Sequence, residues 1–586
     1  MSEYQKNARN AKALFTLRVH RGDGMCLLAM NWKRTRPPTD FVGFAIEYKE
    51  PDGDRFYALK NRIAFPTAAG DTNPNRLSTR LSPIQKFRWV HFPRNAELPG
   101  EFTYRVTPVF MNDLDELSYG EPQVVEIALR RETYPNKLNV TFTRGFVSSQ
   151  AFVDKYVLEG QTPTEAVRML LPAKADAGLE FVPTHPRASA ALEWMGFEAR
   201  SAILEVLDEA IADPTAQVRA VLYDLNEPDV LSRLERLGQR LRIIIDDDGA
   251  HGEETSAESR AAARLAGTAA FVKRQHLGKL QHNKTIVVDG KRVQRCVCGS
   301  TNLSWRGFFV QNNNAIVLRG ARAVQLFRAA YDHYEANDTA KAFGGTSSAM
   351  WSDLQLPGID AQVSFSPKVR EHSALEAIGK DIADQTTSSL FFSLAFLYQT
   401  PGAIQEAIAK LQADDRVFCY GISDHAVKGL TKDGDPKGDA LGVKLQKPSG
   451  RVTLIHPEAL SKHLPQPFKA EPTGGGGTRL HHKFIVIDFD KPTARVYTGS
   501  YNFSKAADAS NGENLLLIRD RRVAVSYVVE ALRIFDHYHF RVAQADASKA
   551  RTRLHLKRPP RKPGEHPWWS ADYSDPRKVL DRELFA

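Results

Sequence analysis

The sequence contains only four cysteines in 586 residues, at positions 26, 296, 298 and 419. So few cysteines at uneven spacing argue against a disulfide framework and favour a reducing compartment. Cys296 and Cys298 lie two residues apart but lack a second pair at zinc-ligand spacing. We therefore interpret them as small buried side chains and not as metal ligands.

The sequence also lacks any apolar run close to the roughly 18 residues that are needed to cross a bilayer. Its first residues, MSEYQKNARNAKALF, include neither an apolar core nor a small-residue cleavage site, so they do not resemble a secretory leader. From these two absences we expect a cytoplasmic location.

The overall composition is that of a globular protein, with 42% hydrophobic and 25% charged residues. The length favours about three to four domains. The net charge is +10, which suits an anionic partner such as nucleic acid or an acidic lipid surface. Basic residues gather near the C-terminus, because residues 549–562 include seven Lys or Arg and no Asp or Glu.

Residues 1–135 show the pattern of an all-β domain. Strand-like segments at 25–32, 41–48, 87–92 and 102–110 are separated by turn signals, which is typical of a β-sandwich. The alternation of Phe44, Ile46 and Tyr48, and the Ser-Tyr-Gly-Glu-Pro turn at 118–122, resemble a fibronectin type III domain. The resemblance implies a spacer or binding module that contacts a protein partner.

Residues 136–545 alternate between strand-like and helix-like segments, and the same order of segments occurs twice. Even the closing helices match, since Tyr331 and Phe535 each precede Asp-His-Tyr. This repetition predicts an internal duplication with α/β halves at 136–345 and 346–545. Residues 546–586 are basic and contain Pro and Trp, so we interpret them as an extended arm.

Each half contains one copy of a His-x-Lys-x4-Asp motif that is followed by Gly-Ser-x-Asn. The first copy consists of His282, Lys284, Asp289, Ser300 and Asn302, and the second consists of His481, Lys483, Asp488, Ser500 and Asn502. One His-x-Lys-x4-Asp match could arise by chance. Two copies with the same downstream turn, at matching places in a repeated unit, indicate function.

The spacing within the motif has a simple geometric meaning. Strand side chains alternate between faces, so the histidine and lysine of each copy share one face. Asp289 and Asp488 have the opposite parity, and we expect them to anchor structure. The Gly-Ser-x-Asn turns can present hydroxyl, amide and N–H groups to phosphate oxygens. An equal alternative is that Ser300 and Ser500 satisfy the backbone of their own turns.

The paired motif resembles the phospholipase D superfamily over residues 138–545. The resemblance implies that the duplicated α-β-α halves form one site at their interface, without a metal or other cofactor. It implies that one histidine attacks phosphorus to form a phosphohistidine, while the other protonates the leaving oxygen and then activates water or an alcohol. By likeness, His282 is the nucleophile and His481 the general acid/base. The groups that would hold the phosphate oxygens are Lys284, Lys483, Asn302 and Asn502.

One departure from the family pattern distinguishes the two copies. Glu513 lies 13 residues after Ser500, where the family places an acidic residue that orients a histidine. The same offset from Ser300 gives Asn313. We predict that Glu513 supports the second half and that Asn313 takes its place in the first. The asymmetry favours different roles for the two histidines, and the alternative is weakened activity in half one.

The sequence leaves the substrate open. The leading hypothesis is cleavage of a phospholipid headgroup, by hydrolysis or by transfer to an alcohol. A nuclease of the same superfamily is the main alternative, and cardiolipin-synthase-like transfer is another. An inactive binding or scaffold protein is the alternative from a different class. The basic tail, with Trp568 and Trp569, would allow contact with an anionic membrane.

Overall fold

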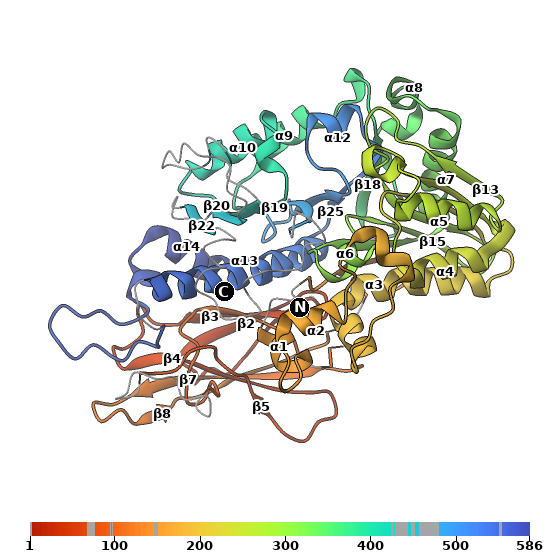
Figure 1. The fold of residues 1–586 in the computed structure, drawn as a ribbon. Helices are drawn as coiled ribbons and strands as arrows, with labels where there is room; N and C mark the ends of the chain where they lie inside the picture. The colour runs from red at the N-terminus through yellow and green to blue at the C-terminus, as the bar shows by residue number, and fades with distance from the viewer. Residues whose placement is uncertain are drawn as a thin grey trace. The chain divides into compact units, whose positions relative to one another are not determined.

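The computed structural model describes residues 3–66, 77–93, 95–96, 98–129, 132–145, 150–423, 427, 430, 443–446, 452–455, 480–549 and 554–586. The chain divides into two compact units (Figure 1). The first comprises residues 1–131, 447–451 and 525–586, and the second comprises residues 132–446 and 452–524. Among the described residues, no helix is both long and apolar enough to cross a membrane.

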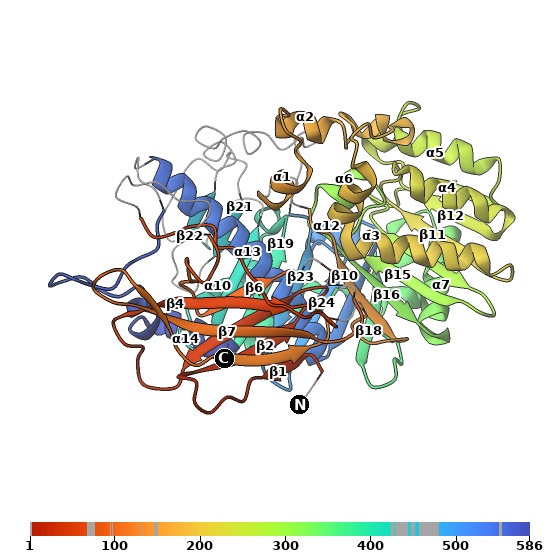
Figure 2. The same cartoon turned by 90° about the horizontal axis from the view of Figure 1, so that it is seen from below.

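The N-terminal part of the first unit is an antiparallel β-sandwich, and Figure 2 shows its strands in red and orange. One sheet has the order β1 (Gln5–Asn7), β2 (Phe15–Arg21), β3 (Cys26–Trp32) and β6 (Arg88–His91). The other has the order β5 (Tyr57–Ala58), β4 (Phe41–Lys49), β7 (Phe102–Met111) and β8 (Leu117–Tyr119), with β9 (Gln123–Ile127) also paired to β7. The predicted all-β domain is confirmed. Its assignment as fibronectin type III stays a prediction.

The core of the sandwich forms where the inward faces of the two sheets meet. Strand β9 has the alternating burial that one solvent-facing side produces. Phe15 of β2 and Phe44 of β4 lie with ring centroids 5.0 Å apart, so apolar side chains from both sheets share one core. The pairing follows from the period-two pattern of the sequence.

The extended arm expected at the C-terminus is a wrong prediction for residues 554–586, which pack within the first unit. The Trp568 indole N–H donates to the Phe41 carbonyl at 3.0 Å, and its ring stacks on Phe87 at 5.1 Å. Trp569 is 6% exposed, and α14 (Pro576–Phe585) follows. The two tryptophans bury enough apolar area to order this segment, although its basic composition is typical of a solvated one. Arg551 and Arg553 lie outside the described residues.

The second unit contains two mixed sheets. The first has the order β10 (Leu138–Phe142), β16 (Asn314–Arg319), β15 (Gln294–Gly299), β14 (Lys284–Asp289), β11 (Gln217–Leu222), β12 (Leu241–Ile245) and β13 (Phe271–Arg274). The second has the order β17 (Ser352–Asp353), β18 (Asp360–Ser366), β25 (Glu513–Arg519), β24 (Arg495–Gly499), β23 (Lys483–Ile487), β19 (Ser389–Leu394), β20 (Phe418–Ser423), β21 (Val443–Gln446) and β22 (Val452–Ile455).

The two sheets share a six-strand core with the same order and directions. Strands β10-β16-β15-β14-β11-β12 correspond one by one to β18-β25-β24-β23-β19-β20. In both sheets the last of these pairs is parallel and the other four pairs are antiparallel. The predicted duplication is therefore confirmed. Strands β14 and β23 are buried on both faces, which explains the continuous apolar runs that follow Lys284 and Lys483.

Helices cover both sheets. In the first half they are α1 (Gln150–Tyr156), α2 (Pro163–Arg168), α3 (Ala188–Ala212), α4 (Pro228–Leu237), α5 (Ala257–Ala266), α6 (Trp305–Phe309), α7 (Ala321–Ala336) and α8 (Ala340–Gly344). In the second half they are α9 (Leu375–Gln385), α10 (Ala403–Gln412), α12 (Lys505–Ala509) and the start of α13 (Arg521–Lys549). Helices α3, α4 and α5 share one core with β11 and β12, and α9 and α10 share another with β19.

Reciprocal hydrogen bonds join the two halves beside the motif residues. The Gly512 N–H donates to Leu280 O at 2.8 Å, just before Glu513 and two residues before His282. The His481 N–H donates to Asn312 O at 3.2 Å. Asn314 and Asn514 also reach across, because each donates its amide to a side chain of the opposite half. The loops that carry the motifs are thereby fixed against one another.

The glycine of each Gly-Ser-x-Asn turn is required by backbone conformation and by space. Gly499 has a φ of +141°, and a Cβ there would lie 2.2 Å from Asn514 O. We expect Gly499→Ala to destabilise the protein by about 2–5 kcal/mol, through left-handed strain and a backbone clash. Gly320→Ala is the matched control, because φ is +116° and nothing lies within 4 Å. Urea denaturation checks this prediction, and an equal loss in both variants would contradict the clash.

Candidate active site

The two motif histidines lie together at the interface of the halves. His282 and His481 each precede a central strand, β14 or β23, by two residues. Their ring centroids are 6.3 Å apart, and both side chains are about 95% buried. Both line one cavity of about 940 Å³. The two motif copies therefore converge on one site, as the sequence predicted.

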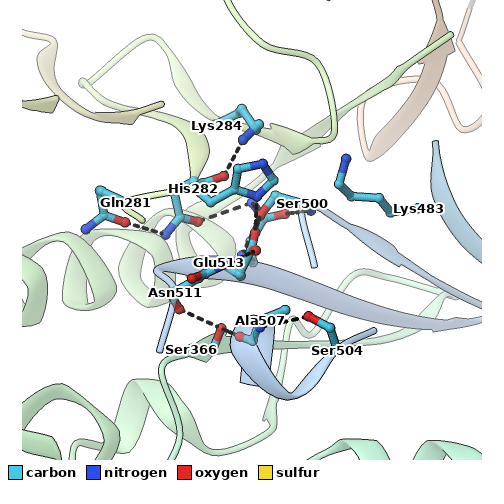
Figure 3. Close-up of polar contacts among 12 residues, drawn as sticks. Gln281, His282, Lys284, Ser366, Lys483, Ser500, Ser504, Ala507, Asn511 and Glu513 are labelled. Atoms are coloured by element: carbon cyan, nitrogen blue, oxygen red, sulfur yellow. Dashed lines mark hydrogen bonds and ion pairs between the residues drawn. The ribbon is translucent and has the colours of Figure 1, made fainter. Parts of the chain in front are cut away.

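Glu513 supports the histidine of the opposite half. His282 Nδ1 lies 2.8 Å from Glu513 Oε2, and the Ser500 hydroxyl donates to the same oxygen at 2.6 Å. The Asn511 amide reaches the other carboxylate oxygen at 3.4 Å. Figure 3 shows the carboxylate of Glu513 below the His282 ring, with Ser500 beside it. The prediction that Glu513 serves its own half is wrong.

Asn313 makes the corresponding contact with His481. Its Oδ1 lies 2.8 Å from His481 Nδ1 and accepts a hydrogen bond from the Ser300 hydroxyl at 3.0 Å. Its Nδ2 donates to Gly307 O at 2.9 Å, which fixes the orientation of the amide. Glu513 and Asn313 thus each cross the interface to the histidine of the other half. Sequence offsets give the distance along the chain but not this crossing.

The two lysines lie beside the histidines and are almost completely buried. Lys284 Nζ donates to His282 O and lies 4.7 Å from the centre of the Tyr223 ring. Lys483 Nζ donates to His481 O at 2.9 Å and lies 3.2 Å from His481 Nε2. Each lysine thus places its ammonium group beside a histidine that lines the cavity, where its charge can stabilise a phosphate group.

Burial shifts the pKa values of the site side chains so that their neutral forms are favoured. It lowers the pKa of both His282 and His481 well below the usual value, and nearby lysines add to the effect. Burial also lowers the pKa of Lys284 to about 8 and raises the pKa of Glu513 to about 8. A bound phosphodiester anion opposes the shifts of the histidines and lysines.

The remaining motif residues fall into two groups. Asn302 and Asn502 line the cavity, and their role as phosphate ligands stays a prediction. Ser300 and Ser500 are fully buried, and their hydroxyls are engaged with Asn313 and Glu513. These serines therefore act on the histidines indirectly, by holding the side chains that contact each Nδ1.

The motif aspartates lie at the far ends of β14 and β23, away from the histidines. Asp289 pairs with Arg328 at 2.7 Å. Asp488 accepts the backbone N–H groups of residues 387, 388 and 389 at 2.8–3.1 Å. Both contacts fit the expected anchoring role.

A polar cluster beside His282 was not found from the sequence. His251 Nδ1 lies 2.8 Å from Asp246 and its Nε2 lies 3.3 Å from Asp224. Burial opposes its charge, but hydrogen bonds to the two aspartates raise the pKa of His251 to about 10. Ligand atoms of Asp224, His251 and Glu258 all lie within 4.8 Å of one another, a spacing that could hold a cation. The run of three aspartates at 246–248 was the available signal.

Comparison with known proteins agrees with this geometry. The family described as "Cardiolipin synthase, PLD-like domain" matches residues 207–334 and 457–535. A phospholipase D of Rickettsia bellii is 48% identical over 112 residues, which cover 19% of this chain and 52% of that protein. A phospholipase D of Rickettsia felis is 50% identical over 48 residues, which cover 8% of this chain and 22% of that protein. The chain thus spans about half of one relative and less of the other.

Solved structures show similarity at low identity. Phosphatidylserine synthase of Haemophilus influenzae is 13% identical, with a TM-score of 0.37, and the match covers 66% of this chain and 91% of that chain. Nuc of Salmonella typhimurium, a phospholipase D family member, is 22% identical, with a TM-score of 0.20, and the match covers 23% and 85% of the two chains. The family match shows a PLD-like domain in two segments, and each segment contains one copy of the paired motif.

Proposed function

We propose that the protein cleaves a phosphodiester through a covalent phosphohistidine on His282, without a metal in the chemical steps. The observation that carries this proposal is the crossed support of the two histidines. Each Nδ1 is held by an acceptor from the opposite half, which leaves each Nε2 for the chemistry, and both histidines line the shared cavity. Two imidazoles in this arrangement suit one nucleophile and one acid/base.

The different acceptors favour different roles. A carboxylate at Nδ1 stabilises the positive charge that develops on an attacking imidazole, so Glu513 supports His282 as the nucleophile. A neutral amide stabilises an imidazolium less well, so Asn313 leaves protonated His481 a stronger acid. The asymmetry therefore supports distinct tasks and does not require that either half be inactive.

The first step exchanges one phosphorus bond for another. His282 Nε2 attacks phosphorus while the bond from phosphorus to the leaving oxygen breaks. His481 donates its Nε2 proton to that oxygen, and the alcohol departs. Lys284 and Lys483 stabilise the charge on the non-bridging oxygens, and we propose that Asn302 and Asn502 assist them.

The second step regenerates the enzyme. Neutral His481 takes a proton from water or from an acceptor alcohol, whose oxygen attacks phosphorus. The bond from phosphorus to His282 Nε2 breaks, and the product is a phosphomonoester or a new phosphodiester. Both half-reactions use the same two groups with their proton roles reversed.

We propose a phospholipid as the substrate, with cleavage at the headgroup. The cavity lining supports this assignment, because Phe396, Ile404 and Phe503 of the second half give it apolar surface suited to a lipid. The net charge of +10 supports the alternative, a nuclease.

Hydrolysis of bis(p-nitrophenyl) phosphate in the presence of EDTA tests the proposed chemistry. We expect turnover that the chelator does not reduce. Parallel assays with phosphatidylcholine, phosphatidylethanolamine, single-stranded DNA and plasmid DNA then decide the substrate class. Cleavage of phospholipid and not of DNA is expected. Faster chelator-resistant cleavage of DNA would support the nuclease instead.

The charge of Lys284 predicts a pH dependence. Because its pKa is lowered to about 8, Lys284 is charged below that pH and loses its charge as the pH rises. We expect this loss to weaken phosphate binding and lower kcat/KM as the pH rises through about 8, although Glu513, whose pKa is also about 8, gains its charge over the same range in wild type and variant alike. Lys284→Arg is the matched variant, because a guanidinium stays charged. Its kcat/KM is expected to be lower overall but without this decline, whereas the same decline in both enzymes would exclude Lys284 as its source.

A further inference from the structure

We propose that Asp224 is a positioning residue, which holds the amide of Asn302 for contact with the phosphate group of the substrate. The inference rests on the proposed phosphodiester cleavage, in which Asn302 assists the lysines. Asn302 Nδ2 donates to Asp224 Oδ2 at 2.7 Å, and both residues line the cavity. An amide nitrogen has two hydrogens, so one can stay on Asp224 while the other is donated to a phosphate oxygen. Asp224 thus acts through Asn302, and it needs no contact of its own with the substrate.

Backbone contacts hold the two segments that carry this bond side by side. Leu225 and Leu303 form a parallel β-bridge, and the Asn226 N–H donates to Leu303 O at 3.3 Å. The Asn226 side chain accepts the Trp305 N–H at 3.0 Å. The two residues of the hydrogen-bonded pair each precede the bridge by one position. Their bond is therefore supported by paired backbone and is not an isolated contact between two flexible loops.

His251 holds the other oxygen of the Asp224 carboxylate. Its Nε2 lies 3.3 Å from Asp224 Oδ1, and its Nδ1 lies 2.8 Å from Asp246 Oδ2. Asp246 also accepts the Gln281 N–H at 2.5 Å, one residue before the attacking histidine. The network therefore connects the loop of that histidine with the amide of Asn302.

Basic groups keep the carboxylate of Asp224 ionised. Burial opposes this charge, but the hydrogen bond from His251 and the nearby charges of Lys284 and Arg306 hold the pKa of Asp224 below its usual value. An ionised carboxylate has two acceptor oxygens, and here one serves His251 and the other serves Asn302. An asparagine in this place has a single acceptor, and the protonated His251 is the stronger donor for it.

The duplication shows that this anchor belongs to the first half. Strands β11 and β19 correspond, and each ends at the residue that pairs with its motif lysine. Two positions later the first half has Asp224 and the second has Phe396, so Asn502 has no carboxylate at the matching position. In the described part of the chain, both motif asparagines have a buried Oδ1 without a hydrogen-bond partner. The two asparagines therefore differ in the carboxylate at Nδ2 and not in this oxygen.

Isothermal titration calorimetry with inorganic phosphate tests the proposal without turnover. The full-length protein in EDTA is titrated as wild type, as Asp224→Ala, as Asn302→Ala and as the double variant. We expect Asn302→Ala to weaken phosphate binding about tenfold when Asp224 is present and about threefold or less when it is absent. The reason is that an amide without its anchor must be ordered on binding, which reduces its contribution.

The double-mutant cycle separates positioning from charge. A carboxylate near the cavity repels phosphate, so its removal alone favours binding, but this effect is the same whether residue 302 is Asn or Ala. Equal weakening by Asn302→Ala in both backgrounds would overturn the proposal, and so would no weakening in either. Thermal melting reports on folding. Asp224→Asn, which keeps the size of the side chain but has one acceptor fewer, replaces Asp224→Ala with the same expectations if that variant does not fold.

Two controls locate the effect at the bond between Asp224 and Asn302. Asn502→Ala is expected to weaken phosphate binding equally with and without Asp224, because that carboxylate does not hold its amide. Asp176→Ala removes another carboxylate that lines the cavity, where it accepts the Ala257 N–H at 3.4 Å. It is expected to leave the effect of Asn302→Ala unchanged. Coupling of Asp224 to Asn502, or equal coupling of Asp176 to Asn302, would overturn the assignment.

Turnover distinguishes this inference from the proposed function. In hydrolysis of bis(p-nitrophenyl) phosphate, the same variants are expected to show the same coupling in kcat/KM. Additive losses in enzymes that still cleave the diester would refute this inference alone. Coupled phosphate binding by a protein that does not cleave the diester would refute the proposed function alone. A wild type that binds phosphate only with a divalent metal, or not at all, would overturn the inference, because Asp224 would then hold a metal or no phosphate site would exist.

Discussion

Replacement of His282 by alanine is expected to lower kcat/KM for bis(p-nitrophenyl) phosphate by on the order of 10⁴-fold. The substitution removes the nitrogen that attacks phosphorus, and no covalent intermediate can then form. The fold should survive, because this side chain faces the cavity and its strand begins two residues later. Steady-state kinetics measures the loss, and the thermal melting temperature reports on folding.

His276→Ala is the matched control for His282→Ala. His276 is a half-exposed histidine whose Nδ1 lies 2.8 Å from Asp247, and it does not line the cavity. We expect its activity to stay within about twofold of wild type. A His282→Ala enzyme that keeps a tenth or more of the wild-type kcat/KM would contradict the assigned nucleophile.

Replacement of Glu513 by glutamine is expected to lower kcat by on the order of 10³- to 10⁴-fold. The variant keeps the shape of the side chain but cannot form the carboxylate that stabilises His282 as it attacks and gains positive charge. Asn313→Ala removes the equivalent support from His481, and its loss is expected to depend on the leaving group. Kinetics with p-nitrophenyl and alkyl phosphodiesters separates the two cases.

The leaving-group dependence tests the crossed pairing itself. p-Nitrophenolate leaves without protonation, so damage to the acid should matter less for that substrate than for an alkyl ester. Glu513→Gln should impair both substrates to a similar degree, because it weakens the attack. Asn313→Ala should impair the alkyl ester more. The opposite pattern would mean that each acceptor serves the histidine of its own half.

Much of the catalytic arrangement was predictable from the sequence because it depends on local periodicity. Two residues separate His282 from Lys284, and two separate His481 from Lys483, so each pair shares a face whatever the surrounding fold. The apolar runs after the lysines indicated buried strands, and the repeat of the motif indicated the duplication. These features lie in a few consecutive residues, where pattern determines structure most strongly.

The features that the sequence did not predict depend on contacts between distant segments. Glu513 lies 231 positions from His282, and their contact follows from the crossing of the two halves. The polar cluster beside His282 joins Asp224 to His251 through the arrangement of loops, not through a motif. Trp568 and Trp569 belong to a basic segment, and only the packed sandwich shows that they complete its core.

The most direct measurement of the central claim is mass spectrometry of the His481→Ala enzyme after reaction with bis(p-nitrophenyl) phosphate. This substrate needs no acid for the first step, but without His481 no group activates water for the second. A phosphoryl adduct is predicted on the peptide that contains His282, with one equivalent of p-nitrophenol released in a burst. The double variant with His282→Ala should carry no adduct. An adduct on another residue, or steady turnover by His481→Ala without any adduct, would contradict the account.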